Sequence, residues 1–204
     1  DGNGSESNPF KTITYAISQA SDGDTINVAE GTYNEKPVIN KALTLKGETG
    51  AIIDVGGDFE GIKITASNVT IDGFKIQNTR YFLIQTNTST MQNNIVLKNN
   101  ILSGRVQLYK VENLDFSHNQ LPGSPEVWYS SGVISGNTMD NVLMGISVMF
   151  CNGLAVQNNT ITARIEENTD AGIFIDGGSG IIVKENTITG FTAGARNGYN
   201  NGTD

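Results

Sequence analysis

The chain has 204 residues and a formal net charge of −8 with a pI near 4.6, which argues against a nucleic acid or an anionic membrane surface as partner. Its single cysteine, Cys151, excludes an internal disulfide, and no apolar run reaches membrane-spanning length, so membrane insertion is not expected. A chain of this length is typical of one domain with a sizeable hydrophobic core.

The first expected element is a short amphipathic helix over residues 9–20, after a polar segment rich in Gly, Ser and Asn. Asn8 followed by Pro9 is typical of a helix start, because Asn is a good N-cap and proline is favoured at the first helical position. Apolar residues then recur at helical spacing up to Ala20. We expect this helix to cap the strands that follow it.

Coils are expected over about residues 24–190, and from residue 68 onward the chain carries six copies of one nine-residue template, whose clearest copy is Gly180–Ile188. The second, fourth and ninth positions are almost all apolar, and the seventh is Asn in five of six copies. The seventh positions fall at residues 74, 100, 119, 137, 159 and 186. A repeat of about twenty residues with β-branched alternation predicts a solenoid whose coils consist of short strands.

The recurrent asparagine has a structural explanation. Asn tolerates left-handed backbone angles, so we expect it at a sharp turn between two strands. In stacked coils such side chains can hydrogen-bond to one another as a ladder. We therefore interpret the following residues as structural rather than as ligands: Asn100, Asn119, Asn137, Asn159 and Asn186.

After Ile188 the repeat fades, and residues 191–204 are interpreted as a tail or a truncated coil. No second capping helix is predicted. A bare solenoid end exposes unpaired strand edges and is an aggregation hazard. We expect either that the chain was cut from a longer solenoid or that its open end docks on a further domain or subunit.

Several stretches resemble the pectin-lyase-like right-handed parallel β-helix superfamily. They are residues 8–17 (NPFKTITYAI), 23–28 (GDTINV), 31–33 (GTY) and 43–47 (LTLKG), followed by the Asn-Thr-Ile repeats. The resemblance implies an all-β, single-stranded right-handed parallel β-helix over residues 1–204. It also implies an extracellular or cell-surface location and a polysaccharide as substrate or ligand. The fold hosts lyases, hydrolases, esterases, adhesins and non-catalytic modules, so it does not specify an activity.

The resemblance guides a search for catalytic residues. The hydrolases of the superfamily use an aspartate cluster with Gly-His-Gly and Arg-Ile-Lys motifs, and these motifs are absent from the sequence. His118, the only histidine, precedes a ladder position at a solvent-facing turn, and we predict no role for it. Hydrolysis, which needs an acid/base pair, is therefore disfavoured.

The lyases of the superfamily remove a proton α to a uronate carboxylate with Lys or Arg, commonly aided by Ca²⁺. The candidates for proton abstraction here are Lys98, Lys184 and Arg164, and Lys98 and Lys184 share one position of the repeat. The candidate metal ligands are Glu166, Glu167 and Asp170, and Ca²⁺ is the cofactor they would hold. The alternative is that the lysines only solubilise the outer face of a coil.

Loops recur between the last apolar residue of each copy and the first strand of the next coil. By repeat position they leave one edge of the solenoid, with coils roughly 4.8 Å apart. They carry or adjoin aromatic and cationic residues suited to stacking on sugar rings and bonding hydroxyls: Arg80, Tyr81, Arg105, Trp128 and Tyr129. The alternative is that these loops are unrelated solvated connections and that Trp128 packs against its own loop.

The sequence thus predicts an extracellular β-helix that binds, or cleaves by β-elimination, a uronate-containing polysaccharide along the loop-bearing edge. The competing hypothesis is a non-catalytic structural or adhesive surface module, or a subunit that stacks through its open end.

Overall fold

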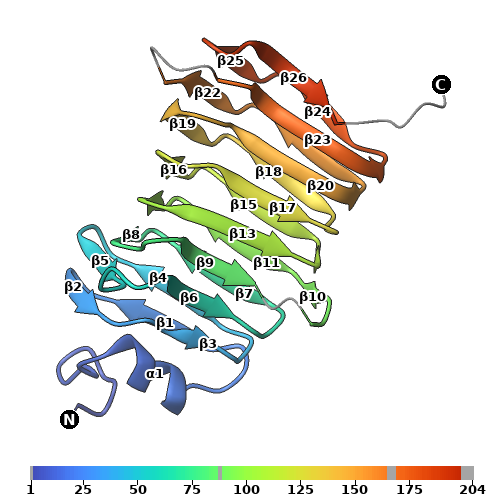
Figure 1. Ribbon diagram of the computed structural model, residues 1–204. Helices are drawn as coiled ribbons and strands as arrows, with labels where there is room; N and C mark the ends of the chain where they lie inside the picture. The colour runs from blue at the N-terminus through green and yellow to red at the C-terminus, as the bar shows by residue number, and fades with distance from the viewer. Residues whose placement is uncertain (1, 87–88, 165–168, 199–204) are drawn as a thin grey trace.

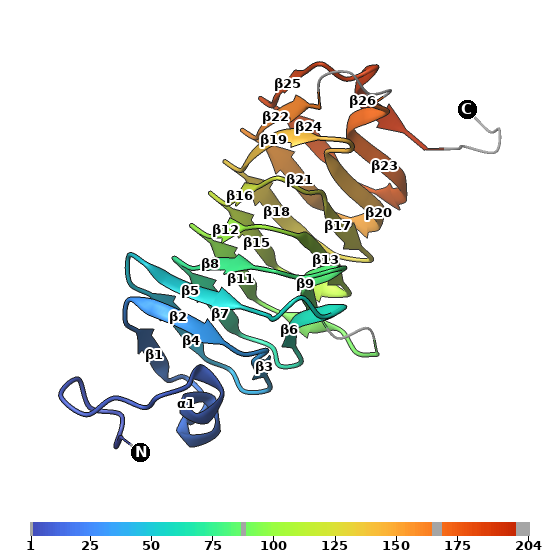
Figure 2. The ribbon, with the colours of Figure 1, turned by 60° about the vertical axis from the view of Figure 1, so that its left-hand side comes forward.

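The computed structural model describes residues 2–86, 89–164 and 169–198. The chain winds into a stack of coils that rises from one short helix near the N-terminus (Figures 1 and 2). Each coil contributes one strand to each of three parallel sheets, and every sheet has eight strands. The predicted all-β right-handed parallel β-helix is confirmed, with about eight coils.

The first sheet comprises β1 (Thr25–Val28), β4 (Thr44–Gly47), β7 (Val69–Asp72), β11 (Ile95–Lys98), β15 (Leu114–Ser117), β18 (Gly132–Ser135), β21 (Leu154–Gln157) and β24 (Ile182–Lys184). The second sheet comprises β2 (Gly31–Asn34), β5 (Ala51–Asp54), β8 (Lys75–Gln77), β12 (Ile101–Leu102), β16 (Gln120–Leu121), β19 (Thr138–Val142), β22 (Thr160–Ala163) and β25 (Thr187–Thr189). The third sheet comprises β3 (Val38–Ile39), β6 (Glu60–Ile64), β9 (Phe82–Thr86), β13 (Arg105–Tyr109), β17 (Pro125–Trp128), β20 (Ile146–Asn152), β23 (Ala171–Ser179) and β26 (Ala193–Asn197). A separate two-stranded sheet pairs β10 (Gln92–Asn93) with β14 (Val111–Glu112).

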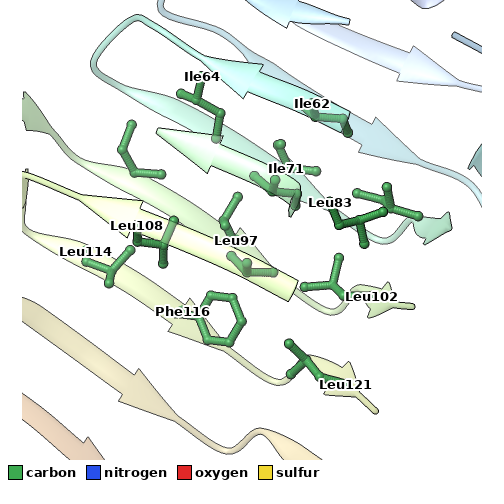
Figure 3. Packing of buried hydrophobic residues seen from close by; sticks show 14 of the residues in the cluster. Ile62, Ile64, Ile71, Leu83, Leu97, Leu102, Leu108, Leu114, Phe116 and Leu121 are labelled. Carbon is green, nitrogen blue, oxygen red and sulfur yellow. The ribbon is translucent and has the colours of Figure 1, made fainter. Parts of the chain in front are cut away.

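The core is a column of apolar side chains that point inward from all three sheets. Within a strand the inner residues alternate with outer ones, as Ile95 and Leu97 do in β11, because strand side chains point to opposite faces. Leu97 of β11 and Phe116 of β15 are register partners and lie in successive layers of this column (Figure 3). Each fully buried side chain of this kind stabilises the fold by about 2 kcal/mol. Because only the inner positions are buried, only these positions select for apolar residues.

The asparagine ladder is confirmed and is directional. The backbone N–H and Nδ2 of each ladder asparagine both donate to Oδ1 of the next one, at 2.9–3.1 Å, from Asn100 through Asn119, Asn137 and Asn159 to Asn186. The first four asparagines are buried. The ladder therefore satisfies polar groups at a turn that packs against the core.

The predicted backbone conformation of the ladder residues is wrong. The left-handed angles fall one residue earlier, with φ between 55° and 84° at Gly73, Asn99, His118, Gly136, Asn158 and Glu185. The ladder asparagine follows this turn residue with its side chain directed inward. The turn residue is exposed or half-buried, so its side chain does not pack in the core. Several residue types therefore occur at this turn position.

The helix α1 spans Ile13–Gln19, shorter than the expected range 9–20, and its N-cap is Thr12 rather than Asn8. The reason lies in the first coil, where the Glu35 carboxylate accepts from the backbone N–H groups of Ile13 at 2.8 Å and Thr14 at 2.7 Å. At the other end of the helix Lys41 Nζ donates to the carbonyls of Ile17, Ser18 and Ala20. A carboxylate at the N-terminus and an ammonium at the C-terminus both match the helix dipole.

The C-terminal end of the stack has no such cap among the described residues. Val183 of β24 is 38% exposed, whereas Val156, its partner in the preceding coil, is 0% exposed. Asn186 accepts from Asn159, but its own backbone N–H has no further asparagine to bond within the described residues.

Candidate functional site

The loops predicted to share one edge all connect a strand of the second sheet to the next strand of the third sheet. These connections are consecutive along the stack, so the edge is continuous (Figure 2). We call it the loop edge. It adjoins the N-terminal ends of the third-sheet strands, whose outer faces are directed away from the core.

Six residues of consecutive coils make contact at this edge, and we call them the loop-edge cluster: Phe59, Arg80, Tyr81, Phe82, Arg105 and Glu126. The Arg105 guanidinium lies over the rings of Tyr81 at 5.0 Å and Phe82 at 5.4 Å, and it forms an ion pair with Glu126. The Arg80 guanidinium lies over the Phe59 ring at 5.9 Å. Phe59 is 67% exposed and Tyr81 is 47% exposed, so the cluster offers ring surface to solvent.

An open pocket of about 440 Å³ continues the cluster toward the first coils. Phe59 forms one wall, and the other lining residues are Lys36, Val38, Asp58, Glu60, Gly61 and Lys63. Lys36 forms an ion pair with Asp58, and this hydrogen bond and charge lower the pKa of the Asp58 carboxyl. Val38 is exposed, so the pocket combines apolar surface with paired charges.

The outer face of the third sheet extends from the cluster and is amide-rich in its middle coils. Gln85, Gln107 and Glu126 lie in one register row across β9, β13 and β17. All three are half-buried and occupy outer positions of adjacent strands. The row presents hydrogen-bond donors and acceptors beside the aromatic cluster.

Trp128 and Tyr129 lie at the other end of these strands, where the third sheet turns toward the first. Tyr129 is stacked on Phe150 with ring centroids 5.4 Å apart, and Tyr109 meets Tyr129 edge-on at 5.3 Å. Trp128 lies 6.3 Å from Phe150, and its Nε1 is buried with no hydrogen-bond partner among the described residues. We call Tyr109, Trp128, Tyr129 and Phe150 the aromatic stack.

The predicted sugar-binding residues are therefore divided into two groups. Arg80, Tyr81 and Arg105 meet at the loop edge, while Trp128 and Tyr129 lie at the far end of the strands. β13 runs from Arg105 to Tyr109, which is four residue steps or about 13 Å. Together the two groups border one strip of outer sheet rather than one compact pocket.

The two candidate lysines lie elsewhere. Lys98 ends β11 and Lys184 ends β24, so both belong to the first sheet. They share one register row, as the repeat predicted, but four strand steps of roughly 4.8 Å separate them. Lys98 lies 3.7 Å from the Asp72 carboxylate. The structure does not bring these lysines together or place them at the loop edge.

Arg164 follows β22 at the loop edge, where its backbone N–H donates to the Val142 carbonyl. Asp170 lies at the same connection and pairs with Arg196 at 2.5 Å. Glu166 and Glu167 lie outside the described residues. Within the described ranges no group of three or more His, Cys, Asp or Glu side chains is placed to hold a metal ion.

Sequence reasoning missed Phe59, Gln85, Gln107 and Phe150. Phe59 precedes the first copy of the template, where the repeat gives no alignment, and the glutamines occupy outer strand positions that any polar residue can fill. A sequence signal existed for Phe150, because it holds the same position of the coil as Tyr129 in the coil before. In the structure both residues have a left-handed φ, 53° at Phe150 and 49° at Tyr129. Bulky residues seldom adopt that conformation, so the stacked rings offset a backbone cost.

The first comparison concerns the N-terminal coils. A family described as a protein of unknown function (DUF1565) matches residues 1–48, which contain the capping helix and the first strands. This match and the three-sheet topology agree with the resemblance seen in the sequence. The chain is a parallel β-helix that is similar to this family over its N-terminal coils. No solved structure matches this β-helix.

A curated relative gives the second comparison. A cell surface glycoprotein of Methanothermus fervidus is 38% identical over 103 residues, which is 48% of this β-helix and 17% of the relative's length. The β-helix therefore matches a small part of a much longer surface protein. None of the described residues belongs to a helix long and apolar enough to cross a membrane.

Proposed function

We propose that this β-helix is a cell-surface module that binds polysaccharide along the outer face of the third sheet, with the loop-edge cluster as its main contact. The observation that supports the proposal most is the exposed pair of Phe59 and Tyr81 with Arg80 and Arg105 over their rings. The surface location is supported by the similarity to a cell surface glycoprotein.

The chemistry of the cluster suits a sugar chain. Aromatic rings stack on the apolar faces of sugar rings, and a guanidinium donates to hydroxyl or carboxylate oxygens. Arg105 is held in place by Glu126 and two rings, so little side-chain freedom remains to be lost on binding. Arg80 has an aromatic neighbour and, among the described residues, no ion pair with a carboxylate, so its charge suits a uronate group.

The register of the third sheet suits an extended ligand. Gln85, Gln107 and Glu126 repeat every coil at roughly 4.8 Å, so a chain lying along the stack axis meets an equivalent polar group at each step. The protein carries a net charge of −8, so long-range electrostatics oppose the approach of a polyanionic ligand. Affinity would depend on these local contacts.

Catalysis by β-elimination would need a base at this strip, and Arg164 is the predicted candidate that adjoins the loop edge. Ca²⁺ would serve to acidify the proton next to the uronate carboxylate if Asp170 and the adjacent acidic residues held it. Lys98 and Lys184 would act there only on a ligand that also reached the first sheet. Binding without cleavage is therefore the function we favour.

Affinity electrophoresis against a panel of neutral and uronate-containing polysaccharides tests the proposal. Tyr81→Ala and Arg105→Met should each weaken retardation by about tenfold, while Tyr15→Ala should not change it. Tyr15 is a matched control because it is 45% exposed, close to Tyr81, but lies on the capping helix. Equal retardation of the three variants would refute this site, and calcium-dependent formation of unsaturated product would establish a lyase.

A second function, stacking through the open C-terminal end, is favoured by a different observation. The ladder ends at Asn186, whose N–H bonds no further asparagine in the described part of the chain, and Val183 exposes inner apolar surface. A parallel coil from a neighbouring domain or subunit would satisfy both. Ile182→Lys on the edge strand β24 should then abolish any concentration-dependent association in light scattering, and a monodisperse monomer at every concentration would count against self-stacking.

A further inference from the structure

A second amide ladder lies on the outside of the solenoid, at the turn between the third and first sheets. Its members are Asn68, Asn94 and Asn113, which are all exposed and have φ of 56°, 56° and 57°. Asn94 Nδ2 donates to Asn68 Oδ1 at 2.7 Å, and Asn113 Nδ2 donates to Asn94 Oδ1 at 3.2 Å. Each Nδ2 thus bonds the preceding coil, toward the N-terminus.

This direction leaves one side-chain nitrogen unused. Asn68 is the first member, so its Nδ2 has no preceding asparagine to bond and makes no hydrogen bond within the described ranges, while its Oδ1 remains held by Asn94. Asn68 is also the only member followed by the pattern X-Thr, since Val69 and Thr70 come next. The acceptor motif for N-linked glycans therefore coincides with the one available amide nitrogen of the ladder.

A second site has the same local geometry. Asn158 begins the sequence Asn158-Asn159-Thr160, has φ of 55°, and is exposed at the turn between the first and second sheets. Its side chain makes no hydrogen bond in the part of the chain that the structure describes. Asn159, the middle residue, has its side chain turned inward in the buried ladder, so it does not compete for the same space.

We propose that the folded protein carries N-linked glycans on Asn68 and Asn158. In this reaction Nδ2 bonds to C1 of an oligosaccharide activated by a lipid phosphate. The bond from C1 to the phosphate oxygen breaks, the lipid phosphate leaves, and Nδ2 loses one proton to a base of the transferase. At Asn68 the product keeps Oδ1 available to Asn94, so modification does not break the ladder.

The placement of the two sites has a structural consequence. Asn68 precedes β7 and Asn158 follows β21, so both flank the first sheet, on opposite edges. The loop edge lies between the second and third sheets and carries neither site. Glycans at these positions would cover the first sheet and leave the loop edge open. The proposal does not depend on polysaccharide binding at that edge.

The folded chain should be incubated with a purified oligosaccharyltransferase and a lipid-phosphate-linked oligosaccharide, and site occupancy followed by peptide mass spectrometry. A matched control is Val96→Thr, which places a sequon at Asn94, whose Nδ2 is engaged in the ladder. Val96 lies on the outer face of β11, in register with Thr70, so the substitution disturbs no inner packing. A second variant, Thr70→Val, removes the sequon at Asn68 without touching the asparagine.

We expect modification at Asn68 and Asn158 in the folded chain, loss at Asn68 alone in Thr70→Val, and about fivefold slower modification at Asn94 than at Asn68 in Val96→Thr, because one hydrogen bond must break first. In urea-unfolded Val96→Thr all three sites should react alike. The proposal is overturned if Asn68 and Asn158 stay unmodified in the folded chain while the unfolded chain reacts. Equal rates at Asn94 and Asn68 in folded Val96→Thr would overturn the ladder argument.

Discussion

Replacing Asn119 by alanine should be among the most destabilising single changes in this β-helix. Asn119 is 1% exposed, and its side chain accepts from the N–H and Nδ2 of Asn100 and donates to the Leu97 carbonyl and to Asn137 Oδ1. Asn100 N–H and the Leu97 carbonyl lose their side-chain partner outright, and each such buried group costs about 1–3 kcal/mol. We expect a loss of about 3–5 kcal/mol in the free energy of unfolding.

Urea unfolding followed by far-ultraviolet circular dichroism measures this loss, with Gln120→Ala as control because Gln120 is the exposed next residue. In a solenoid each coil contacts only its neighbours, so Asn119→Ala should also split one transition into two as the coils on either side separate. A loss below about 1 kcal/mol with one unchanged transition would show that water or a shifted backbone satisfies these groups. The ladder would then not hold the coils together.

Further predictions concern the cap, the aromatic stack and the acidic residues. Glu35→Gln and Lys41→Met should each lower stability by about 1–2 kcal/mol in the same assay and raise hydrogen exchange of α1 amides, because each removes charge-assisted bonds to a helix end. Gly177→Ala should lower the melting temperature by several degrees, because its Cβ would lie 2.5 Å from Phe150 Cδ1 at a φ of 65°. Hydrogen bonds from Gln77, Gly56 and Asn78 lower the Asp54 pKa below 3.8, so its stabilising contribution is present above about pH 4 and is lost as the pH falls through the folded-state pKa. Asp54→Asn should flatten that part of a stability-versus-pH curve, and an unchanged slope would assign it to other carboxylates.

The sequence was informative wherever the inside of the solenoid constrains it. Apolar residues recur at positions such as Ile71 and Leu97 because these side chains are fully buried. Asparagine recurs at positions such as Asn119 because a buried turn needs both hydrogen-bond donors and acceptors. These constraints predicted a solenoid with coils of short strands and the asparagine ladder, whereas the third strand of each coil became evident only in the structure. The capping helix was also predicted, because its apolar spacing is a local property.

Contacts between distant residues were not predictable in this way. Glu35 fixes the start of the helix at Ile13, and nothing near Asn8 in the sequence indicates this. The left-handed residue was misplaced by one position because the template identifies the asparagine that recurs, while the turn residue before it varies from His118 to Glu185. Its side chain points to solvent, so the fold accepts any residue that tolerates the angle.

The same physical reason separates fold from function along the whole chain. Outer positions such as Gln107 and Lys98 contribute little to the core, so they are free to vary, and a binding surface built from them leaves no periodic signal. The loops themselves share one edge, as predicted, because each connects the second sheet to the third. The coil-to-coil register determines which aromatic and cationic side chains are in contact. It places Arg105 over the ring of Tyr81, and it places Trp128 beside Phe150. The binding proposal therefore depends on pairs of residues one coil apart, and variants of both members of a pair are its most direct test.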